Sequence, residues 1–557
     1  MADNGEDVQG TLRIYSNTDD FSSNSHHIIF EPQPTDSPND PINWNVWRKS
    51  WHAFLVLWIV GFTAATSNID GCEEYGEKAE LGISWSSQNL AAGILFLGIG
   101  YATWLLAPVP SLYGRRLVYL ICLIWSLIGT IWLANVQTTQ DALWNQLFVG
   151  ASEAVGEATA QLSLSDIFFQ HQRGASMGLY LFSTSVGTYL GPLLGGFVAD
   201  GVGWRWVGWS SAIITSVALV VFYFGFEETS FDRSVVRLRG VEITPGESVE
   251  IGPRQNSGQM DRSPEKATEK ESEKDVVLEA PDVQIEILET VPTQSVEKEK
   301  SYFQRIALVT RGPVLRGTGF KQYIKELWLV AQVFLFPAVW YSGLQWGAQD
   351  AWLSFYLNTE EDVWVGAPWN YSNNAAAIMN VPTLIGAMVG CLWGGWFSDY
   401  FVLWMARRHG GVAEAEHRLW LVLPAAVISP AGLMLFGIGT GEGWAWPAPY
   451  VGLGMIGFGW GCGGDLSMAY LQDAYPKMVL EGMVGVSVIN NSIGAIFSIV
   501  TGSWETSQGS RKTYITIGVL SFACMMLTLP MMYWGKKCRR MTQARYNRYV
   551  NTRDRTG

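Results

Sequence analysis

The feature that most constrains this chain is a series of long apolar stretches. A helix of about 20 apolar residues crosses the ~30 Å hydrocarbon core of a bilayer. We find twelve such stretches in the 557 residues, and several contain Gly, Pro, Ser or Asn, which membrane helices tolerate. We therefore predict an all-α membrane protein with twelve transmembrane helices. The predicted spans run near 51–69, 88–107, 117–135, 142–164, 176–199, 204–226, 327–357, 374–398, 418–438, 447–472, 483–503 and 513–535.

Charged residues are gathered outside these stretches. Only 16% of the residues are charged, against about 25% in a typical soluble protein. Residues 1–50, 227–325 and 536–557 hold 53 of the 87 Asp, Glu, Lys and Arg residues. This distribution excludes a soluble enzyme, a nucleic-acid-binding protein and a fibrous protein. We predict two six-helix bundles, 51–226 and 326–535, between a largely disordered N-terminal tail, a largely disordered central loop and a basic C-terminal tail.

Basic residues in the short connections predict the orientation of the chain. Lys and Arg favour the cytosolic side of a membrane, and here Arg115 and Arg116 follow the second predicted span and Arg173 follows the fourth. We therefore expect both termini and the central loop to be cytosolic, in the plasma membrane or alternatively in the vacuolar membrane. An Asn-Tyr-Ser sequon at Asn370 falls in a predicted outside loop, so Asn370 is a candidate glycosylation site.

The two halves of the sequence look like copies of each other. The segment "WSSQNLAAGI" from Trp85 aligns without a gap with "WNYSNNAAAI" from Trp369. The segment that starts at Gly178 aligns in the same way with the one that starts at Gly485, including several glycines. The second span therefore pairs with the eighth, and the fifth with the eleventh. Parallel six-helix repeats are the plan of many alternating-access transporters.

Short motifs lie at the ends of these spans. Each places Gly, Trp or a charged residue where two helices are joined, and their order along the chain is more specific than any single motif. They are "DPINWNVWRK" from Asp40, "LYGRR" from Leu112, "DIFFQHQRG" from Asp166, "GTYLGPLLGG" from Gly187, "GWRW" from Gly203, "EETSFDR" from Glu227, "GGWFSD" ending at Asp399 and "YLQDAYP" from Tyr470.

This combination resembles the major facilitator superfamily, and within it the fungal drug:proton antiporter type with twelve spans. The resemblance covers about residues 40–535. It implies a major facilitator fold and alternating-access transport of a small organic compound. Two departures concern the proton: Ser111 replaces the acid that often precedes the "GRR" loop, and Gln146 replaces an arginine that the family links to proton coupling.

The motifs also predict gating contacts. Gly114 permits a close backbone approach, and Arg115 and Arg116 can bond helix-end carbonyls or acids on neighbouring helices. Glycines every fourth residue from Gly187 make a flat helix face, which Pro192 bends. We expect this face to seal where the halves meet; the alternative is ordinary close packing. The candidate gating residues are Gly114, Arg115, Arg116, Asp166, Arg173, Gly187, Gly191, Pro192, Gly195 and Asp399.

Acidic residues inside the spans are the best site candidates, because a charge in the bilayer is costly and usually functional. Glu153 and Glu157 share one face of the fourth span, and Asp465 lies on its repeat partner, the tenth. We predict proton or cation coupling, led by Glu157; the alternative is a hydrogen-bonded structural acid. Asp350 is expected at the outer rim. Because spans one, four, seven and ten face the cavity in this superfamily, the candidate lining residues are Asn68, Gln161, Trp340, Tyr341, Gln345, Gln349 and Trp460.

The predicted function is proton-coupled efflux of a small organic compound, such as a fungal secondary metabolite or a xenobiotic. The alternative is proton-coupled uptake of a nutrient such as a polyamine or a vitamin, since several acids suit a cation. A non-transporting sensor is a third candidate. The sequence has no GxSxG, HExxH or paired catalytic His, so we expect no enzyme activity. Six scattered Cys predict neither a metal site nor a disulfide framework, and we expect a monomer without a cofactor.

Overall fold

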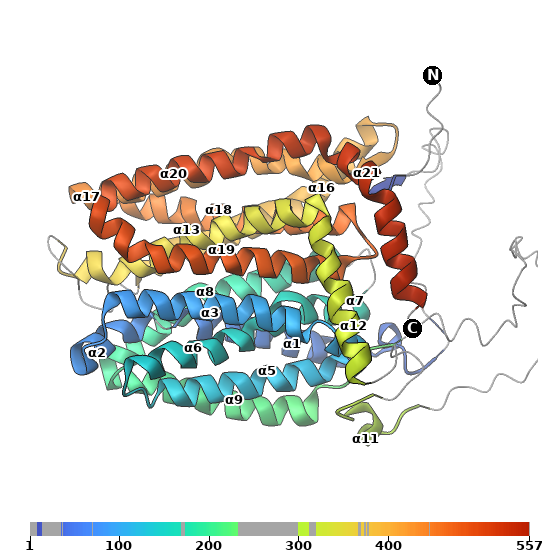
Figure 1. Cartoon of the computed structure of the whole chain (residues 1–557), viewed down its shortest axis with the longest axis horizontal. Coiled ribbons are helices and arrows are strands. Elements are labelled where there is room, and N and C mark those ends of the chain that lie inside the picture. Colours follow the sequence, from blue (N-terminus) through green and yellow to red (C-terminus); the bar gives the residue numbers. More distant parts are fainter. Residues whose placement is uncertain are drawn as a thin grey trace, which may run out of the picture.

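Two bundles of nearly parallel helices lie side by side in the computed structural model (Figure 1). The chain completes the first bundle, coloured blue to green, before it enters the second, coloured yellow to red. The structure describes residues 8–13, 35, 37–69, 71–168, 173–231, 299–310, 319–365, 369–371, 375, 378–444 and 446–555.

The first bundle is made of long helices joined by short turns. A short helix, α2, follows α1. The fourth long helix consists of α6, η3 and α7 without a break, and its middle part, η3, is a π-helix. Its elements are α1 (Val46–Asn68), α2 (Gly71–Leu81), α3 (Trp85–Leu106), α4 (Val109–Leu112), α5 (Arg115–Leu133), α6 (Thr139–Ala154), η3 (Val155–Ala160), α7 (Gln161–Ile167), α8 (Arg173–Val202) and α9 (Arg205–Gly225).

The second bundle follows the same order after a helix that lies across its end. A π-helix, η6, again interrupts one long helix. Its elements are α12 (Phe320–Ala331), η5 (Gln332–Leu335), α13 (Pro337–Val365), α15 (Asn380–Leu392), η6 (Trp393–Phe397), α16 (Ser398–Arg408), η7 (Ala415–Leu421), α17 (Val422–Glu442), α18 (Ala448–Ala474), α19 (Val479–Gln508), α20 (Ser510–Met526) and α21 (Thr528–Arg555).

The long helices have the length and composition of membrane spans. Among the described helices, nine are long and apolar enough to cross a membrane, and α12–η5 with α13 form a tenth as a pair bent by 83°. The other two predicted spans correspond to α6–η3–α7 and α18, which run beside the rest (Figure 1). These two carry Glu153, Glu157 and Asp465. The all-α prediction is confirmed.

The same helix pairs pack together in both bundles. In the first, α1 packs on α8, α3 on α6 and α5 on α9; in the second, α13 packs on α19, α15 on α18 and α17 on α20. Glycines allow the backbones to touch at matching places. A Cβ atom on Gly150 would collide with the carbonyl oxygen of Leu95, and one on Gly457 with that of Thr383. The packing therefore repeats as the aligned segments predict.

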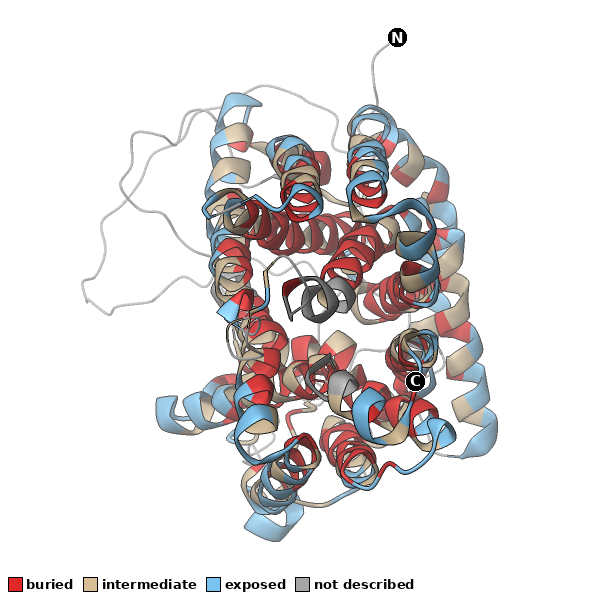
Figure 2. Ribbon diagram, turned by 90° about the vertical axis from the view of Figure 1, so that its left-hand side faces the viewer, coloured by how far each residue is buried: buried red, intermediate tan, exposed pale blue. Residues whose placement is uncertain are grey.

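The two bundles meet along two helix pairs, which we call the seam. On one side α3 packs along α19, and on the other α8 packs along α15. The first contact is close: a Cβ atom on Gly100 would lie 2.9 Å from Cβ of Asn491. Figure 2 looks along the helices and shows buried residues in the middle and exposed residues around the rim. Many exposed residues are apolar, including Ile213, Val217 and Val220 on α9, as a lipid-facing surface requires.

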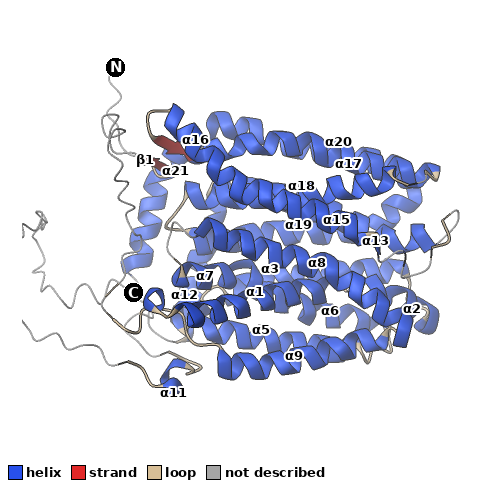
Figure 3. Ribbon diagram, turned by 180° about the vertical axis from the view of Figure 1, so that it is seen from behind, coloured by secondary structure: helices blue, strands red, loops and turns tan. Residues whose placement is uncertain are grey.

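The first described strand and the end of α21 lie at one end of the bundles, together with α11 (Tyr302–Arg305) and α12 (Figures 1 and 3). We call this end the termini face, and the end that carries α2 the opposite face. Strand β1 (Thr11–Arg13) pairs antiparallel with β2 (Val412–Glu414) of the second bundle. Arg539 of α21 holds this corner through a buried ion pair with Glu416. The N-terminal segment is thus attached to the second bundle.

Several boundaries differ from the prediction. Helix α12 begins at Phe320, inside the segment expected to be a loop, and α21 extends to Arg555, through the expected basic tail. The reason is that α12 and α21 each bury one side against the bundles, including Leu329 and Tyr549, which a charge count does not detect. The middle of the central loop, residues 232–298, and most of the N-terminal tail lie outside the described residues.

Candidate functional site

Glu157 lies in η3, the π-helix in the middle of the fourth long helix. A π-helix inserts one extra residue into a turn, and such segments often mark functional sites. The Glu157 carboxyl lies against the hydroxyl of Ser487 on α19, across the seam. Glu153, one turn earlier, lies against the hydroxyl of Ser67 on α1. Both glutamates therefore point to the middle of the molecule.

Asp350 joins these two glutamates. Its carboxylate accepts a hydrogen bond of 2.6 Å from Nε1 of Trp460, and it interacts electrostatically with Glu153 and Glu157. The expectation of a rim position is wrong, because α13 runs from Pro337 to Val365 and places Asp350 near its middle. We call Glu153, Glu157 and Asp350 the central acids.

Aromatic rings from both bundles surround the central acids. The ring of Trp460 on α18 packs edge-on against Tyr189 on α8, with 5.8 Å between the ring centroids. It also lies 5.6 Å from the ring of Trp346 on α13. All three rings are buried. Carboxylates beside aromatic faces form an environment that suits an organic cation.

Two of the predicted cavity residues lie beside this centre or the seam. Trp460 contacts Asp350 as described, and Gln161 on α7 accepts a hydrogen bond of 3.5 Å from Gln472 on α18. This bond crosses between the bundles. Asn68 donates to the carbonyl of Ala64 on its own helix at 2.8 Å.

The other four predicted cavity residues lie on α13. Three of them bond to neighbours inside the second bundle, and the fourth, Trp340, is 53% exposed and donates to the carbonyl of Phe334. These bonds run toward α17, α20 and α21, while Gln349 also lies against Gly459 and Gly463 of α18, and the cavity-lining role of these residues stays a prediction. The three bonds are Tyr341 to Thr528, Gln345 to the carbonyl of Cys524, and Ser429 to Gln349.

Asp465 occupies a separate place. It belongs to α18, is 7% exposed and lies against the π-helix η6. A Cβ atom on Gly394 of η6 would lie 2.8 Å from Oδ2 of Asp465. This oxygen is buried and has no hydrogen-bond partner within the described part of the chain. Each bundle thus has a π-helix beside a buried acid, but Asp465 is not one of the central acids.

The "GRR" turn forms the contacts expected of it at the termini face. Arg115 pairs with Asp166 at the end of α7, and Arg116 donates to the carbonyl of Tyr223 near the end of α9. The carboxylate of Glu228 accepts from the backbone N–H groups of Arg115 and Arg116 at 3.0 and 3.1 Å. Gly114 has φ of +103°, where a side chain is strained. This turn therefore links α5, α7 and the segment after α9.

The second bundle has a matching network around Arg418 of η7, which the sequence analysis missed. Its guanidinium lies 2.9 Å from Asp399 and 3.0 Å from Asp473, and it donates to the hydroxyl of Ser398 at 2.5 Å. Asp399 and Asp473 both belong to motifs noted in the sequence analysis. Arg418, a basic residue at the start of the ninth predicted span, was the sequence signal that could have indicated their partner. In a buried ion pair, removal of one partner leaves the other as an uncompensated charge, which destabilises the fold.

The glycine face of α8 packs differently from the expectation. Cβ atoms on Gly187 and Gly191 would collide with Gly61 and Ala65 of α1, inside the first bundle. The contact of α8 with the second bundle includes Ser185, whose hydroxyl lies 3.4 Å from Sγ of Cys391. The face therefore does not seal the seam. Pro192 lies inside α8 and Gly195 is buried, and the side chain of Arg173 is outside the described part.

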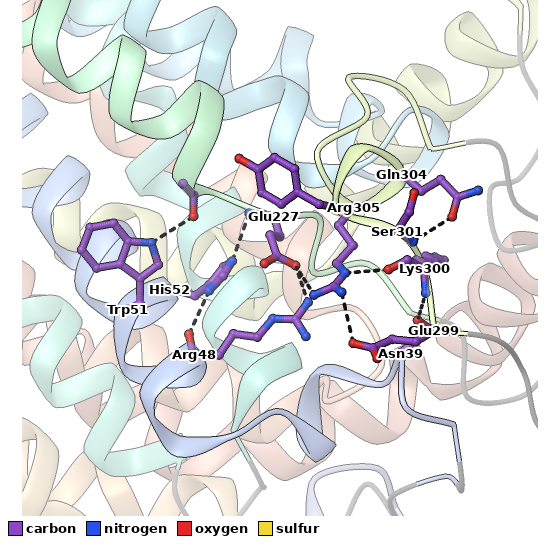
Figure 4. Close-up of polar contacts among 12 residues, drawn as sticks. Asn39, Arg48, Trp51, His52, Glu227, Glu299, Lys300, Ser301, Gln304 and Arg305 are labelled. Atoms are coloured by element: carbon purple, nitrogen blue, oxygen red, sulfur yellow. Dashed lines mark hydrogen bonds and ion pairs between the residues drawn. The ribbon is translucent and has the colours of Figure 1, made fainter.

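Glu227 attaches the end of the first bundle to the segment that leads to the second. Its carboxylate pairs with Arg48 and lies 3.9 Å from a guanidinium nitrogen of Arg305. Its backbone N–H donates to Nε2 of His52 at 3.0 Å, and Arg305 also reaches Glu299 at 3.1 Å (Figure 4). The two ends of the long central segment therefore meet at the start of α1.

A family model described as Major Facilitator Superfamily matches residues 52–499. The chain belongs to the major facilitator superfamily. This major facilitator protein is 47% identical to an uncharacterised MFS-type transporter of Schizosaccharomyces pombe, over 99% of this chain and 96% of the relative. It is 44% identical to Protein HOL1 of Saccharomyces cerevisiae, over 99% of this chain and 98% of the relative.

More distant comparisons agree on the family. "Probable efflux pump mfs2" of Aspergillus flavus is 22% identical over 84% of this chain and 97% of the relative. The fold is similar to that of the xylose transporter XylE from E. coli in a partially occluded inward-open conformation, with a TM-score of 0.54 and 12% identity over 86% of this chain and 97% of that one. This major facilitator protein is therefore a membrane transporter rather than an enzyme.

Proposed function

We propose that this transporter carries a small organic cation and couples its movement to protons. The observation that supports this most is the group of central acids between the two bundles. Their partners are hydroxyl, amide and indole groups: Ser67 for Glu153, Ser487 for Glu157, and Trp460 with Asn490 for Asp350. When one of these carboxyl groups ionises, a bound cation balances its negative charge.

The same three carboxyl groups supply the physical basis for coupling. An ionised acid inside a membrane protein costs about 3 kcal/mol when it is not compensated, and neighbouring carboxylates repel one another. A bound cation or bound protons reduce both the cost of the buried charge and the repulsion between the carboxylates. Because the two compete for the same oxygens, arrival of one favours release of the other. Glu157 is the first candidate for this exchange, since it contacts Ser487 across the seam.

For the direction of transport we propose export, as in a proton antiporter of the plasma membrane with cytosolic termini. The support is the resemblance of the "GTYLGPLLGG" motif to the export type and the name of the distant Aspergillus flavus relative. Uptake of a nutrient amine, such as a polyamine, or of a vitamin is the second candidate. The central acids favour it, because carboxylates bind an amine that arrives from either side.

The test is flux of labelled organic cations, organic anions and neutral compounds in both directions across sealed vesicles that contain the full chain. We expect flux of at least one cation, and inhibition when an ionophore collapses the proton gradient. Glu157→Gln is expected to abolish the pH dependence. Glu442→Gln is the matched control, since Glu442 pairs with Arg511 at the opposite face. Transport of anions alone, or flux that ignores the gradient, contradicts the proposal.

A further inference from the structure

Helix α12 lies across the seam at the termini face. It meets α13 at an angle of 83°, so it runs roughly along the membrane plane while α13 crosses the membrane (Figure 1). The hydroxyl of Tyr323 donates to the carbonyl of Leu105, at the end of α3 in the first bundle. Val330 is buried in one apolar cluster with Ala107 of the first bundle and Val484 of the second. One side of α12 is therefore held by both bundles.

The other side of α12 is apolar and exposed. Phe320, Ile324 and Trp328 follow each other at intervals of four residues, so they form one stripe. Phe320 is 79% exposed and Trp328 71% exposed. Lys321 and Lys325 are exposed beside the stripe. A helix with an apolar stripe, flanking lysines and an interfacial Trp is the form that lies in the headgroup region of a bilayer.

We propose that α12 is a lipid-binding crossbar, whose apolar stripe enters the leaflet at the termini face and whose lysines bind anionic phospholipid headgroups. Two observations determine this occupant. The transmembrane helix α13 begins at Pro337, directly after η5, which fixes α12 at the level of the membrane boundary. Lys321 and Lys325 carry the charge that complements anionic phospholipid, which is concentrated in the cytosolic leaflet.

The position of the crossbar gives the lipid a regulatory effect. Val333 of η5 packs against Gly485 of α19, and Tyr323 holds the end of α3, so the two bundles cannot part at this face without releasing one end of α12. Lipid that holds α12 flat therefore stabilises the closed seam. This inference rests on the transporter fold and on the proposed cytosolic orientation of the termini face, and not on the proposed substrate, so the lipid site and the substrate can fail separately.

The first test measures the depth of the stripe by cysteine labelling in sealed vesicles with the termini face outward. Ile324→Cys and Lys321→Cys are treated with a membrane-impermeant maleimide, and labelling is compared with that of the unsubstituted chain. Both residues are exposed and one turn apart, so neither change disturbs the buried side of α12. We expect Ile324→Cys to react at least tenfold more slowly. Equal rates overturn the proposal, because they place the stripe in water.

The second test measures headgroup binding in nanodiscs of neutral phosphatidylcholine with and without phosphatidylserine. Phosphatidylserine is expected to raise the thermal midpoint of the full chain. The double variant Lys321→Gln with Lys325→Gln is expected to weaken phosphatidylserine binding on the order of 10-fold and to lose this rise. The matched control is the double variant Lys477→Gln with Lys512→Gln, which changes two exposed lysines outside α12. It is expected to keep the rise in thermal midpoint.

Two results overturn the lysine part of the proposal. The first is an equal loss, in the α12 variant and in the control, of the rise in thermal midpoint that phosphatidylserine causes. Such an equal loss shows a general charge effect. The other is an equal rise produced by soluble inorganic phosphate in neutral nanodiscs, which shows an anion site that needs no lipid. Transport assays are not needed for either readout, so the outcome is independent of the substrate.

Discussion

Replacing Asp350 by Asn tests the central acids most directly. Asn has the same shape and keeps an oxygen that can accept the hydrogen bond from Trp460, so the change removes one charge and little else. Two unit charges ~5 Å apart attract by about 3 kcal/mol at an effective dielectric constant near 20. If hydration lost on binding offsets half of this, about 1.5 kcal/mol remains, which is about tenfold in affinity.

The assay is the KM for the transported cation, measured with the full chain in sealed vesicles at constant proton gradient. We expect KM to rise about tenfold in Asp350→Asn while the amount of folded protein is unchanged. Glu442→Gln, which removes a carboxylate at the opposite face, is expected to leave KM unchanged. An unaltered KM in Asp350→Asn would refute the reasoning, since it would show that the substrate does not meet this carboxylate.

The remaining predictions concern packing, charge and surface. Gly150→Ala should destabilise the fold by about 1–3 kcal/mol in thermal unfolding, while Gly178→Ala, where a Cβ atom meets nothing within 4 Å, should not. Arg418→Gln should lower expression of folded protein, because it leaves two acids unpaired; normal expression and transport would contradict this. Burial opposes ionisation of Glu414, but the ammonium group of Lys536 outweighs it and lowers the pKa of Glu414 below the ordinary value. The ion pair should therefore stabilise the fold at pH values above the ordinary pKa of a glutamate, and this stabilisation should be lost as the pH falls through the lowered pKa. Glu414→Gln should remove this pH dependence in thermal unfolding. Asn370→Gln should remove any glycan seen as a gel shift; no shift on enzymatic deglycosylation of the unsubstituted chain would exclude the site.

The sequence determines the class of fold because charge cannot be placed freely in a membrane. Stretches without charge, the basic turns and the repeat of Gly-rich segments together predicted the two bundles. The seventh span shows where this reasoning ends. Its apolar run starts near 327, but the chain bends by 83° between Leu335 and Pro337, and residues before the bend lie across the bundle. This shift moved Asp350 from an expected rim to the centre.

Periodicity also predicts that a helix has a particular face but not what that face contacts. Glycines every four residues in α8 did make a flat face, yet it packs on Gly61 in the same bundle. Gln345 and Gln349 lie on the expected helix, yet they bond to Cys524 and Ser429 of the second bundle. Such choices depend on the rotation of a helix against its neighbours, which is set by packing of residues far apart in the chain.

The attachment of strand β1 has a consequence for the order in which the protein is made. Gln9 donates to the carbonyl of Arg539, which is 530 residues away, and Thr11 pairs with Glu414. The contacts of this segment can therefore form in two steps: β1 can pair once Glu414 has been made, and Gln9 can bond only after α21 has been made. The bond from Gln9 to Arg539 thus forms only after the whole membrane-spanning part has been synthesised, and a chain that stops before α21 can still pair β1 with β2 but lacks this bond.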